Sequence, residues 1–279
     1  MMKMCQVFGV SKSGYYAWRK RPKSSQREKK EQLVQQIRNE YLKSRKIYGS
    51  PKITQELCKQ GIRVSQKTVA RIMSEEGLRS FTVRKFKAPT NSNHPYNVYG
   101  NLLKQNFQAM APNEGWMADI TYIPTGEGWL YLASMMDLYT RKIVGWYIDN
   151  RMTKELVIQA LQRALNNERP TGRVTHHSDR GSQYASNDYQ QLLQEHHFQF
   201  SMSRRGNCYD NACMESFHGL IKKECIYPNR FRTRKEVKQA IFEYIECFYN
   251  RKRSHSALEY ASPCEFEAAY YANQRKVAA

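Results

Sequence analysis

Apolar residues recur at helical spacing through residues 27–59, which predicts two consecutive helices. The first is expected over residues 27–44. A turn at residues 48–51 follows, and the second helix begins at the Ser-Pro pair of that turn and ends at Gly61. The side chains expected to face inward are Leu33, Ile37, Tyr41 and Leu42 from the first helix, and Ile53, Leu57 and Cys58 from the second.

A third helix is predicted directly afterwards, over residues 64–73. Ser65 is a suitable N-cap, because its hydroxyl can accept a hydrogen bond from a free N–H of the first turn. The residues expected inside are Val69, Ile72 and Met73, and the basic residues expected outside are Lys67 and Arg71. A basic helix after a short turn and another helix is typical of a helix-turn-helix, although ordinary helical hairpins share this pattern.

From Trp116 onward the pattern changes to short β-rich segments separated by turn signals. The predicted strands are 116–122, 130–136, 142–148, 174–177 and 198–202, and the predicted helices are 154–166, 187–195, 210–225 and 234–249. Three adjacent strands are thus followed by helix, strand, helix, strand and helix. This order predicts an α/β protein with a mixed five-stranded sheet flanked by helices, as in the ribonuclease-H-like fold.

Changes in composition divide the chain into five segments. Residues 79–105 keep few apolar periodicities and contain several Lys, Arg, Pro and Asn residues, which indicates an extended basic linker. The expected segments are a helical piece at 1–24, a small all-α helix-turn-helix domain at 25–80, the linker at 81–108, a ribonuclease-H-like core at 109–225 and a helical extension at 226–279.

Positive charge is concentrated in the first third of the chain. The formal net charge is +20, and residues 1–105 hold 23 basic against 6 acidic side chains, whereas residues 106–279 hold 22 against 19. A polyanion such as DNA is the natural partner for this excess, because each neutralised phosphate releases condensed counterions. The alternative is a basic surface that only keeps the protein soluble.

No segment predicts a membrane span or export. The longest apolar stretch, Gly128 to Met136, is too short to cross a bilayer, and the N-terminus carries no secretory signal. The seven cysteines are odd in number and widely spread, which favours free thiols in a reducing compartment. We therefore expect a cytoplasmic protein without a membrane partner.

Three carboxylates occur where the predicted fold would bring them together. Asp119 lies within the first strand, Asp179 follows the strand that ends at His177, and Glu215 lies on the long helix, with 35 residues between it and Asp179. Phosphodiester cleavage requires a nucleophilic oxygen near neutral pH and a counter-charge on the reacting phosphate, and two divalent ions can supply both. Mg²⁺ prefers oxygen ligands. These three acids are therefore the candidate metal ligands and catalytic residues.

Helix geometry strengthens the assignment of Glu215. Its helix carries a polar stripe and, beside it, an apolar stripe suited to burial against the sheet. The polar stripe consists of Asn211, Glu215, His218 and Lys222, and the apolar stripe consists of Met214, Phe217 and Ile221. A polar stripe is usually a solvated helix face, but its spacing from Asp179 favours a site. Lys222 would then face a phosphate or the target strand.

Residues 116–224 closely resemble the DDE catalytic core of bacterial insertion-sequence transposases, which are relatives of retroviral integrases. The matching segments are Trp116-Met117-Ala118-Asp119-Ile120-Thr121-Tyr122, His177-Ser178-Asp179-Arg180-Gly181-Ser182-Gln183-Tyr184, Asp210-Asn211-Ala212 with Glu215, and the C-terminal Tyr249-Asn250-Arg251-Lys252-Arg253-Ser254-His255. The chain is similar in particular to the downstream-frame product of elements that make their transposase from two overlapping frames.

This resemblance implies both an activity and partners. The family's fold is ribonuclease-H-like, its metal is Mg²⁺, two per site, with Mn²⁺ as a substitute, and its reaction is hydrolytic nicking at element ends followed by 3′-OH strand transfer. The implied partners are element-end and target DNA, further copies of the chain, and an upstream-frame helix-turn-helix and leucine-zipper protein. Two alternatives remain open: a nuclease without strand transfer, and a non-catalytic DNA-binding regulator built on residues 27–80.

Several further residues are candidates for DNA contact. Besides Lys222 in the core and Lys67 and Arg71 in the helix-turn-helix, the candidate residues are Arg180, Arg204 and Arg205, with Arg251, Lys252, Arg253 and His255 nearer the C-terminus. For each of them ordinary surface charge is the competing interpretation. His177 is expected to organise a turn rather than touch substrate, and both Trp116 and Trp129 are expected in the core.

Overall fold

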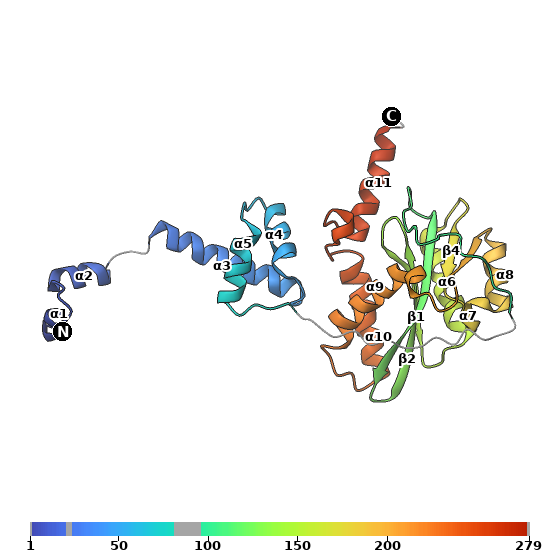
Figure 1. Ribbon diagram of the computed structural model, residues 1–279, viewed down its shortest axis with the longest axis horizontal. Helices are drawn as coiled ribbons and strands as arrows, with labels where there is room; N and C mark the ends of the chain where they lie inside the picture. Colours follow the sequence, from blue (N-terminus) through green and yellow to red (C-terminus); the bar gives the residue numbers. More distant parts are fainter. Residues whose placement is uncertain (1, 21–23, 81–95, 278–279) are drawn as a thin grey trace. The chain divides into compact units, whose positions relative to one another are not determined.

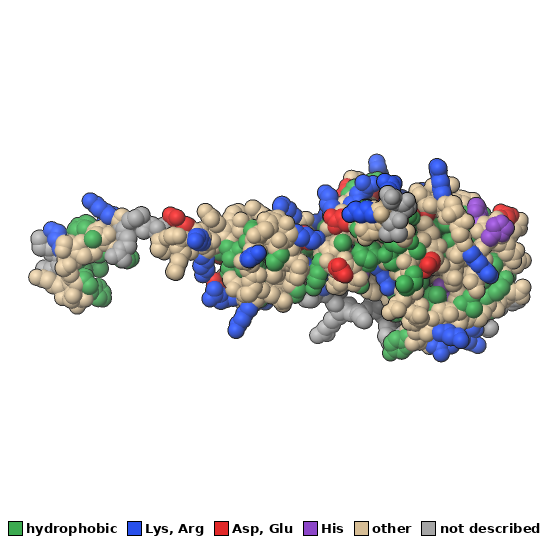
Figure 2. All heavy atoms as spheres, turned by 90° about the horizontal axis from the view of Figure 1, so that it is seen from above, with side chains coloured by type: hydrophobic (Ala, Val, Ile, Leu, Met, Phe, Trp, Pro, Cys, Tyr) green, Lys and Arg blue, Asp and Glu red, His purple; other side chains and the backbone are tan. Residues whose placement is uncertain are grey.

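The chain divides into two compact units, Met1–Ser80 and Phe81–Ala279. The structure is a computed structural model, and it describes residues 2–20, 24–80 and 96–277. The first unit consists of helices, and the second contains a sheet with helices on its faces (Figure 1). Lys and Arg side chains are spread over the visible face of the first unit and of the second (Figure 2).

The first unit contains five helices in its described residues. They are α1 (Met2–Val7), α2 (Lys12–Lys20), α3 (Ser25–Lys43), α4 (Ser50–Lys59) and α5 (Gln66–Glu75). Ser24 and Ser65 begin α3 and α5, and each hydroxyl accepts a hydrogen bond from a first-turn N–H, at 3.3 and 3.2 Å. The predicted N-cap at Ser65 is therefore correct.

A small apolar core joins α3, α4 and α5. Its fully buried side chains are Ile37, Ile53, Leu57, Val69 and Ile72. Two predicted inward residues are exposed instead: Leu42 at 53% and Cys58. Each lies one residue after a buried position, Tyr41 or Leu57, and one residue turns the side chain by about 100° around a helix.

The second unit is built on a five-stranded sheet with the order β3-β2-β1-β4-β5. The strands are β1 (Gly115–Thr125), β2 (Gly128–Asp137), β3 (Ile143–Asp149), β4 (Thr175–Ser178) and β5 (Gln199–Met202). The pairs β1–β2 and β2–β3 are antiparallel, whereas β1–β4 and β4–β5 are parallel. The predicted mixed five-stranded sheet, preceded by a helical region, is confirmed.

Helices cover both faces of this sheet (Figure 1). On one face, α6 (Lys154–Glu168), α7 (Ser182–Ala185) and α8 (Asn187–Glu195) pack on Trp116, Ala118 and Ala133. Gly145 allows β3 to approach α6 closely, because a Cβ atom there would lie 2.6 Å from the Cβ of Ala164. The other face is covered by α9 (Ala212–Ile221) and α10 (Arg234–Phe242).

The segment before β1 packs against the sheet edge. Tyr99 stacks on Phe200 with ring centroids 4.5 Å apart, and the N–H of Leu102 donates to Ser201 Oγ at 2.9 Å. These residues fall in the predicted extended linker, which contains no helix or strand in its described residues and packs on the sheet at these points. The contacts involve ring stacking and single hydrogen bonds, which leave no periodic pattern in the sequence. Residues 81–95, the rest of the predicted linker, lie outside the described residues.

Helices after the sheet contain two π-helical stretches. The 3₁₀ turn η1 (Cys208–Asn211) precedes α9, which continues as the π-helix η2 (Lys222–Ile226), and α10 continues as the π-helix η3 (Glu243–Tyr249). A second 3₁₀ turn, η4 (Ser256–Leu258), leads to α11 (Pro263–Val277). Within residues 2–20, 24–80 and 96–277, no helix is long and apolar enough to cross a membrane.

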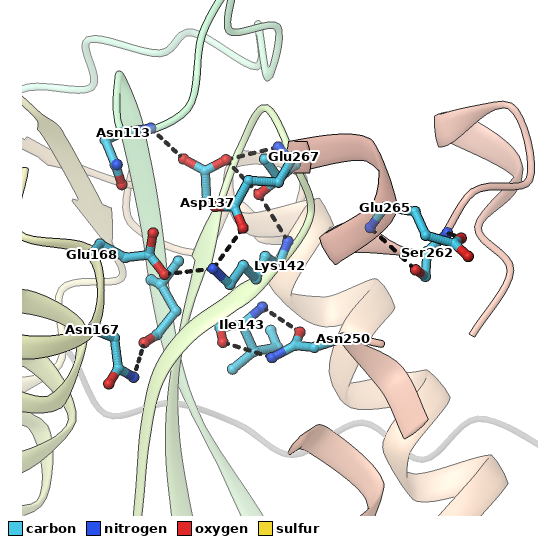
Figure 3. A network of polar contacts seen from close by, with 12 residues as sticks. Asn113, Asp137, Lys142, Ile143, Asn167, Glu168, Asn250, Ser262, Glu265 and Glu267 are labelled. Atoms are coloured by element: carbon cyan, nitrogen blue, oxygen red, sulfur yellow. Dashed lines mark hydrogen bonds and ion pairs between the residues drawn. The ribbon is translucent and has the colours of Figure 1, made fainter. Parts of the chain in front are cut away.

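A network of polar contacts fastens the C-terminal helices to the sheet (Figure 3). Lys142, just before β3, places its Nζ 2.9 Å from Glu168 Oε1 and 2.8 Å from Glu267 Oε2, and so connects the start of β3 to α6 and α11. The Asn250 amide bonds both the N–H and the C=O of Ile143, at 2.9 and 3.0 Å. Burial raises the pKa of the Glu168 carboxyl.

Candidate active site

Asp119 and Asp179 lie side by side because of the parallel pairing of β1 with β4. Met117 is the register partner of His177. Two residues further along each strand are Asp119, within β1, and Asp179, directly after β4 ends. Successive side chains alternate between faces, so a step of two residues keeps both carboxylates on the face of Met117 and His177.

Backbone N–H groups hold one oxygen of each of these carboxylates. The N–H of Ile120 donates to Asp119 Oδ1 at 2.8 Å, and the N–H of Gly181 donates to Asp179 Oδ1 at 2.9 Å. Both side chains are half-buried. The pKa of the Tyr122 hydroxyl is raised by burial first, then by Tyr131 and by the negative charges of Asp179 and Asp119. The same two charges, after burial and Tyr189, also raise the pKa of the buried Tyr184 hydroxyl.

His218 connects α9 to the first carboxylate. Its Nδ1 lies 3.3 Å from Asp119 Oδ2, its Nε2 lies 2.8 Å from Ser134 Oγ, and the residue is only 5% exposed. Ser134 is the register partner of Asp119 on β2. The imidazole is therefore held between two neighbouring strands, with one nitrogen directed at each side chain. The sequence placed His218 in the polar stripe of the helix, but only the packing of α9 on the sheet shows this contact.

We expect His218→Ala to slow DNA cleavage about 10- to 100-fold, the usual loss when a group that orients a metal-binding side chain is removed. The rate should be measured as a function of Mg²⁺ concentration, because a less well oriented Asp119 needs more metal. His218→Gln, which keeps a hydrogen-bonding nitrogen, should retain part of the rate. His196→Ala, at an exposed histidine on the same unit, is the control. An unchanged Mg²⁺ dependence in His218→Ala would contradict this role.

Glu215 is the most exposed of the three predicted acids. It lies on α9, one turn before His218, whereas the two aspartates are half-buried. Within the described residues, no group of three or more His, Cys, Asp or Glu side chains has the geometry to hold a metal ion. The structure places Asp119 and Asp179 two residues beyond a pair of register partners and carries Glu215 on the helix that contacts β1.

Lys222 lies near the first aspartate, at the start of the π-helix η2. Its side chain is half-buried, and burial lowers the pKa of the ammonium group whereas Asp119 acts in the opposite direction. The predicted apolar stripe of Met214, Phe217 and Ile221 is buried against the sheet as expected. The helix thus carries His218 and the following Lys222 near Asp119.

Some predicted DNA contacts have partners inside the protein. Arg180 Nε donates to the C=O of Ser203 at 2.7 Å. Arg204 contacts Asp210 through two nitrogens, at 3.0 and 2.9 Å, and this pairing lowers the pKa of the Asp210 carboxyl. Arg205 is exposed on the following loop. Through this ion pair Arg204 holds the segment before α9 in place.

Three other expectations concern buried or exposed side chains. His177 is fully buried within β4, between Ser201 and Ser203, and burial lowers its pKa to about 4, so its role is structural as expected but lies in a strand rather than a turn. Arg253 is also buried, in an ion pair with Glu224, so its expectation as surface charge or DNA clamp is wrong. Trp116 is in the core, but Trp129 is 54% exposed and was wrongly placed there.

In the first unit, Lys67 and Arg71 are exposed on α5 as predicted. Arg71 Nε lies 3.9 Å from Glu75 Oε1, a loose surface contact. Both side chains are on the outer side of a helix whose inner side packs on α4 through Val69, Ile72 and Met73.

Comparison with known proteins agrees with this architecture. Residues 109–208 and 215–270 match two family models described as integrase core domains, and residues 28–86 match an HTH-like domain. The chain is 48% identical to the insertion element IS600 31 kDa protein of Shigella sonnei over 268 residues, which is 96% of this chain and 98% of that protein. It is 43% identical to the transposase InsF for insertion sequence IS3A of Escherichia coli (strain K12), over 95% of this chain and 92% of the relative.

Among solved structures, the HTLV-2 integrase catalytic core domain in complex with magnesium aligns with a TM-score of 0.44 and 16% identity, over 57% of this chain and 99% of that one. The fold, the domain matches and the curated relatives define the class of protein: a transposase with an integrase-type catalytic core of the DDE kind. Within that class, the chain belongs to the IS3 family of insertion-sequence transposases, as the counterpart of the downstream-frame protein InsF.

Proposed function

We propose that Asp119, Asp179 and Glu215 form the catalytic centre with which this transposase nicks DNA at insertion-sequence ends and transfers the 3′-OH strand to a target. The observation that carries the proposal is that Asp119 on β1 and Asp179, just past the end of β4, each lie two residues beyond the paired residues Met117 and His177. Glu215 joins them from α9, the helix whose His218 already contacts Asp119.

The donor atoms of this centre fit Mg²⁺. Asp119 and Asp179 supply hard oxygen donors, and a backbone N–H holds one oxygen of each carboxylate in a fixed orientation. When two Mg²⁺ ions are bound, they supply a counter-charge to the reacting phosphate and lower the pKa of a bound water. Mn²⁺ should substitute, because it accepts the same carboxylate ligands.

The exposed Glu215 side chain completes the proposed centre. An exposed glutamate can change rotamer without unpacking its helix, because Met214 and Phe217 carry the buried contacts of α9. Three carboxylates repel one another, so their approach is favoured only when cations offset the charge. Lys222, near Asp119, is positioned to bind a phosphate oxygen of the strand being cut or joined.

An in vitro cleavage assay on DNA carrying the element's own end sequence tests this function. We expect nicking with Mg²⁺ and Mn²⁺ and little or none with Ca²⁺, which has longer ligand distances and a flexible, larger shell. Labelled target DNA should also yield joined product. Nicking without any joined product would identify a nuclease rather than a transposase reaction, and DNA binding without metal-dependent nicking would contradict the catalytic proposal.

We also propose that α5 is the DNA-recognition helix of the HTH-like domain. Lys67→Glu together with Arg71→Glu should weaken DNA binding and reduce the dependence of log affinity on log salt by about 0.9 for each phosphate that these side chains no longer neutralise. Reversing Lys29 and Lys59, exposed on α3 and α4, gives a control with the same charge change. If the unsubstituted chain, the Lys67 and Arg71 variant and the Lys29 and Lys59 variant all had the same affinity and salt slope, the DNA-binding surface would lie elsewhere.

We also propose further DNA contacts, the partners of the chain and the boundaries of its segments. Arg180, Arg204 and Arg205, on the loops beside Asp179 and α9, are proposed DNA contacts. Bringing two element ends together requires at least two copies of the catalytic chain, so we propose a homo-oligomer on DNA that acts in the cytoplasm, at the nucleoid. We further propose an upstream-frame partner, and a division into segments at residues 24, 80, 108 and 225.

A further inference from the structure

The turn of the β1–β2 hairpin carries an exposed aromatic surface that the proposed chemistry does not use. Trp129 is 54% exposed and meets Tyr122 edge-to-face, with ring centroids 6.5 Å apart. Tyr122 in turn meets its cross-strand partner Tyr131 at 5.3 Å. We call Tyr122, Trp129 and Tyr131 the aromatic strip. The aromatic strip extends from the apolar core on the α6 face of the sheet to the surface, and Trp129 is its outermost residue.

This strip begins three residues along β1 from Asp119, on the opposite face of the sheet. Burial raises the pKa of the Tyr122 hydroxyl, and Tyr131, Asp179 and Asp119 raise it further. Residues of β1 beyond Met117 have no pairing with β4, which ends at Ser178. The edge of β1 is therefore unpaired on that side from Asp119 onward, within the described part of the sheet. A strand of DNA held at the two aspartates can reach the strip by crossing this unpaired edge from one face of the sheet to the other.

Arginines border the hairpin turn next to Trp129. The N–H of Gly126 donates to the C=O of Phe231 at 3.1 Å, and Arg234 Nη2 would lie 3.4 Å from a Cβ atom on Gly128. Arg234 Nε is buried and has no hydrogen-bond partner among the described residues. Arg232 is exposed. The nearby Glu127 and Glu236 accept hydrogen bonds from the backbone N–H groups of Arg234 and Arg232.

We propose that the aromatic strip and these arginines bind an unpaired stretch of the DNA strand next to the reacting phosphate. A flat exposed ring can stack on a base only when that base is not already stacked on both sides, which favours unpaired nucleotides over duplex. The arginines supply cations for the phosphates of the same strand. Its position beside the reacting phosphate rests on the proposed function, whereas the preference for unpaired DNA does not.

The length of strand involved follows from strand geometry. Trp129 is opposite Pro124, five residues beyond Asp119 on β1. At about 3.4 Å per residue the distance is about 17 Å, which corresponds to about five stacked nucleotides. The duplex should therefore be open over about five nucleotides on one side of the cut site.

DNA binding measured without metal tests the proposal separately from catalysis. The probes are a duplex of about 20 base pairs and the same duplex with a tail of about five thymidines, in the presence of a chelator. We expect Trp129→Ala to bind the tailed duplex about tenfold more weakly, within the range for loss of one stacked base, and to bind the plain duplex within about twofold of the unsubstituted chain. Trp129→Phe should keep most of the tail preference. Tyr271→Ala, at an exposed tyrosine on α11, is the control.

A second measurement does not depend on the stability of the alanine variant. Binding of the tail should quench tryptophan fluorescence in the unsubstituted chain, and this quenching should be absent in Trp129→Phe. Arg232→Gln should weaken binding of both probes and lower the salt slope by about one. Equal losses of affinity for plain and tailed duplex in Trp129→Ala, or unchanged quenching in Trp129→Phe, would overturn the proposal. A change of oligomeric state with no change in tail preference would assign the aromatic strip to an interface between copies instead.

Discussion

Asp179→Asn is expected to abolish DNA cleavage while leaving DNA affinity within about twofold. Asparagine keeps the shape of the side chain and can still accept the hydrogen bond from Gly181, but it removes the negative charge proposed to bind metal. A loss of about 4 kcal/mol of transition-state stabilisation corresponds to about a thousandfold in rate. The measurement is the rate of nicking of end-sequence DNA, with affinity determined on the same probe.

Asp119→Asn and Glu215→Gln are expected to have the same effect, because the proposed centre requires all three charges. Asp149→Asn is a matched control. Asp149 lies at the end of β3, and its Oδ1 accepts a hydrogen bond from the next backbone N–H at 2.6 Å, as Asp119 does from Ile120. It should cleave at the normal rate. Retained cleavage in all three active-site variants would remove the basis of the catalytic assignment.

The Glu215 variant is the most informative of the three. Asp119 and Asp179 are already neighbours in the structure, whereas Glu215 is exposed on α9. If Glu215→Gln alone cleaved normally, the two aspartates would form the centre without the helix. If it were inactive like the others, the exposed glutamate must join them when metal and DNA bind.

The sheet and its helices could be predicted because their periodicities are strong. The predicted strand at 116–122 lies inside β1, and the predicted helix at 187–195 has the bounds of α8. Both depend on local alternation or helical spacing, which a single sequence displays directly. The packing of Tyr99 and Leu102 on β5 depends instead on one ring contact and one hydrogen bond, and neither gives a repeating signal.

The sequence predicts the acids of the proposed site but not their surroundings. Carboxylates at a strand and just past a strand end follow from the motif and the expected parallel pairing. The contact of His218 with Ser134 and Asp119 depends on how α9 is rotated on the sheet, which helical spacing does not determine. Trp129 was misplaced for a related reason: an aromatic residue at a hairpin turn resembles a core residue in sequence, but its side chain is 54% exposed at the end of the hairpin.

Arg253→Met is expected to destabilise the second unit by about 3–5 kcal/mol. Arg253 Nη2 and Nε lie 2.7 and 2.8 Å from the two carboxylate oxygens of Glu224, and the Tyr244 hydroxyl donates to the same carboxylate at 2.6 Å. The side chains of Arg253 and Glu224 are only 6% and 3% exposed. Removing the arginine leaves a buried carboxylate without its counter-charge, which costs far more than removal of a surface ion pair. Thermal unfolding should show a fall in Tm of about 10 °C in the transition of this unit.

Two further variants separate the effect on stability of the unpaired Glu224 charge from the effect of losing the arginine side chain. Glu224→Gln combined with Arg253→Met should be more stable than Arg253→Met alone, because the second change removes the unpaired charge. Arg251→Met, at an exposed arginine two residues away, should change stability by less than about 0.5 kcal/mol. If the double variant were destabilised by the sum of the losses measured for Arg253→Met and for Glu224→Gln separately, the two side chains would not be coupled. Because Glu224 lies in the π-helix that continues α9, removal of this ion pair should also slow cleavage by loosening the helix that carries Glu215 and Lys222.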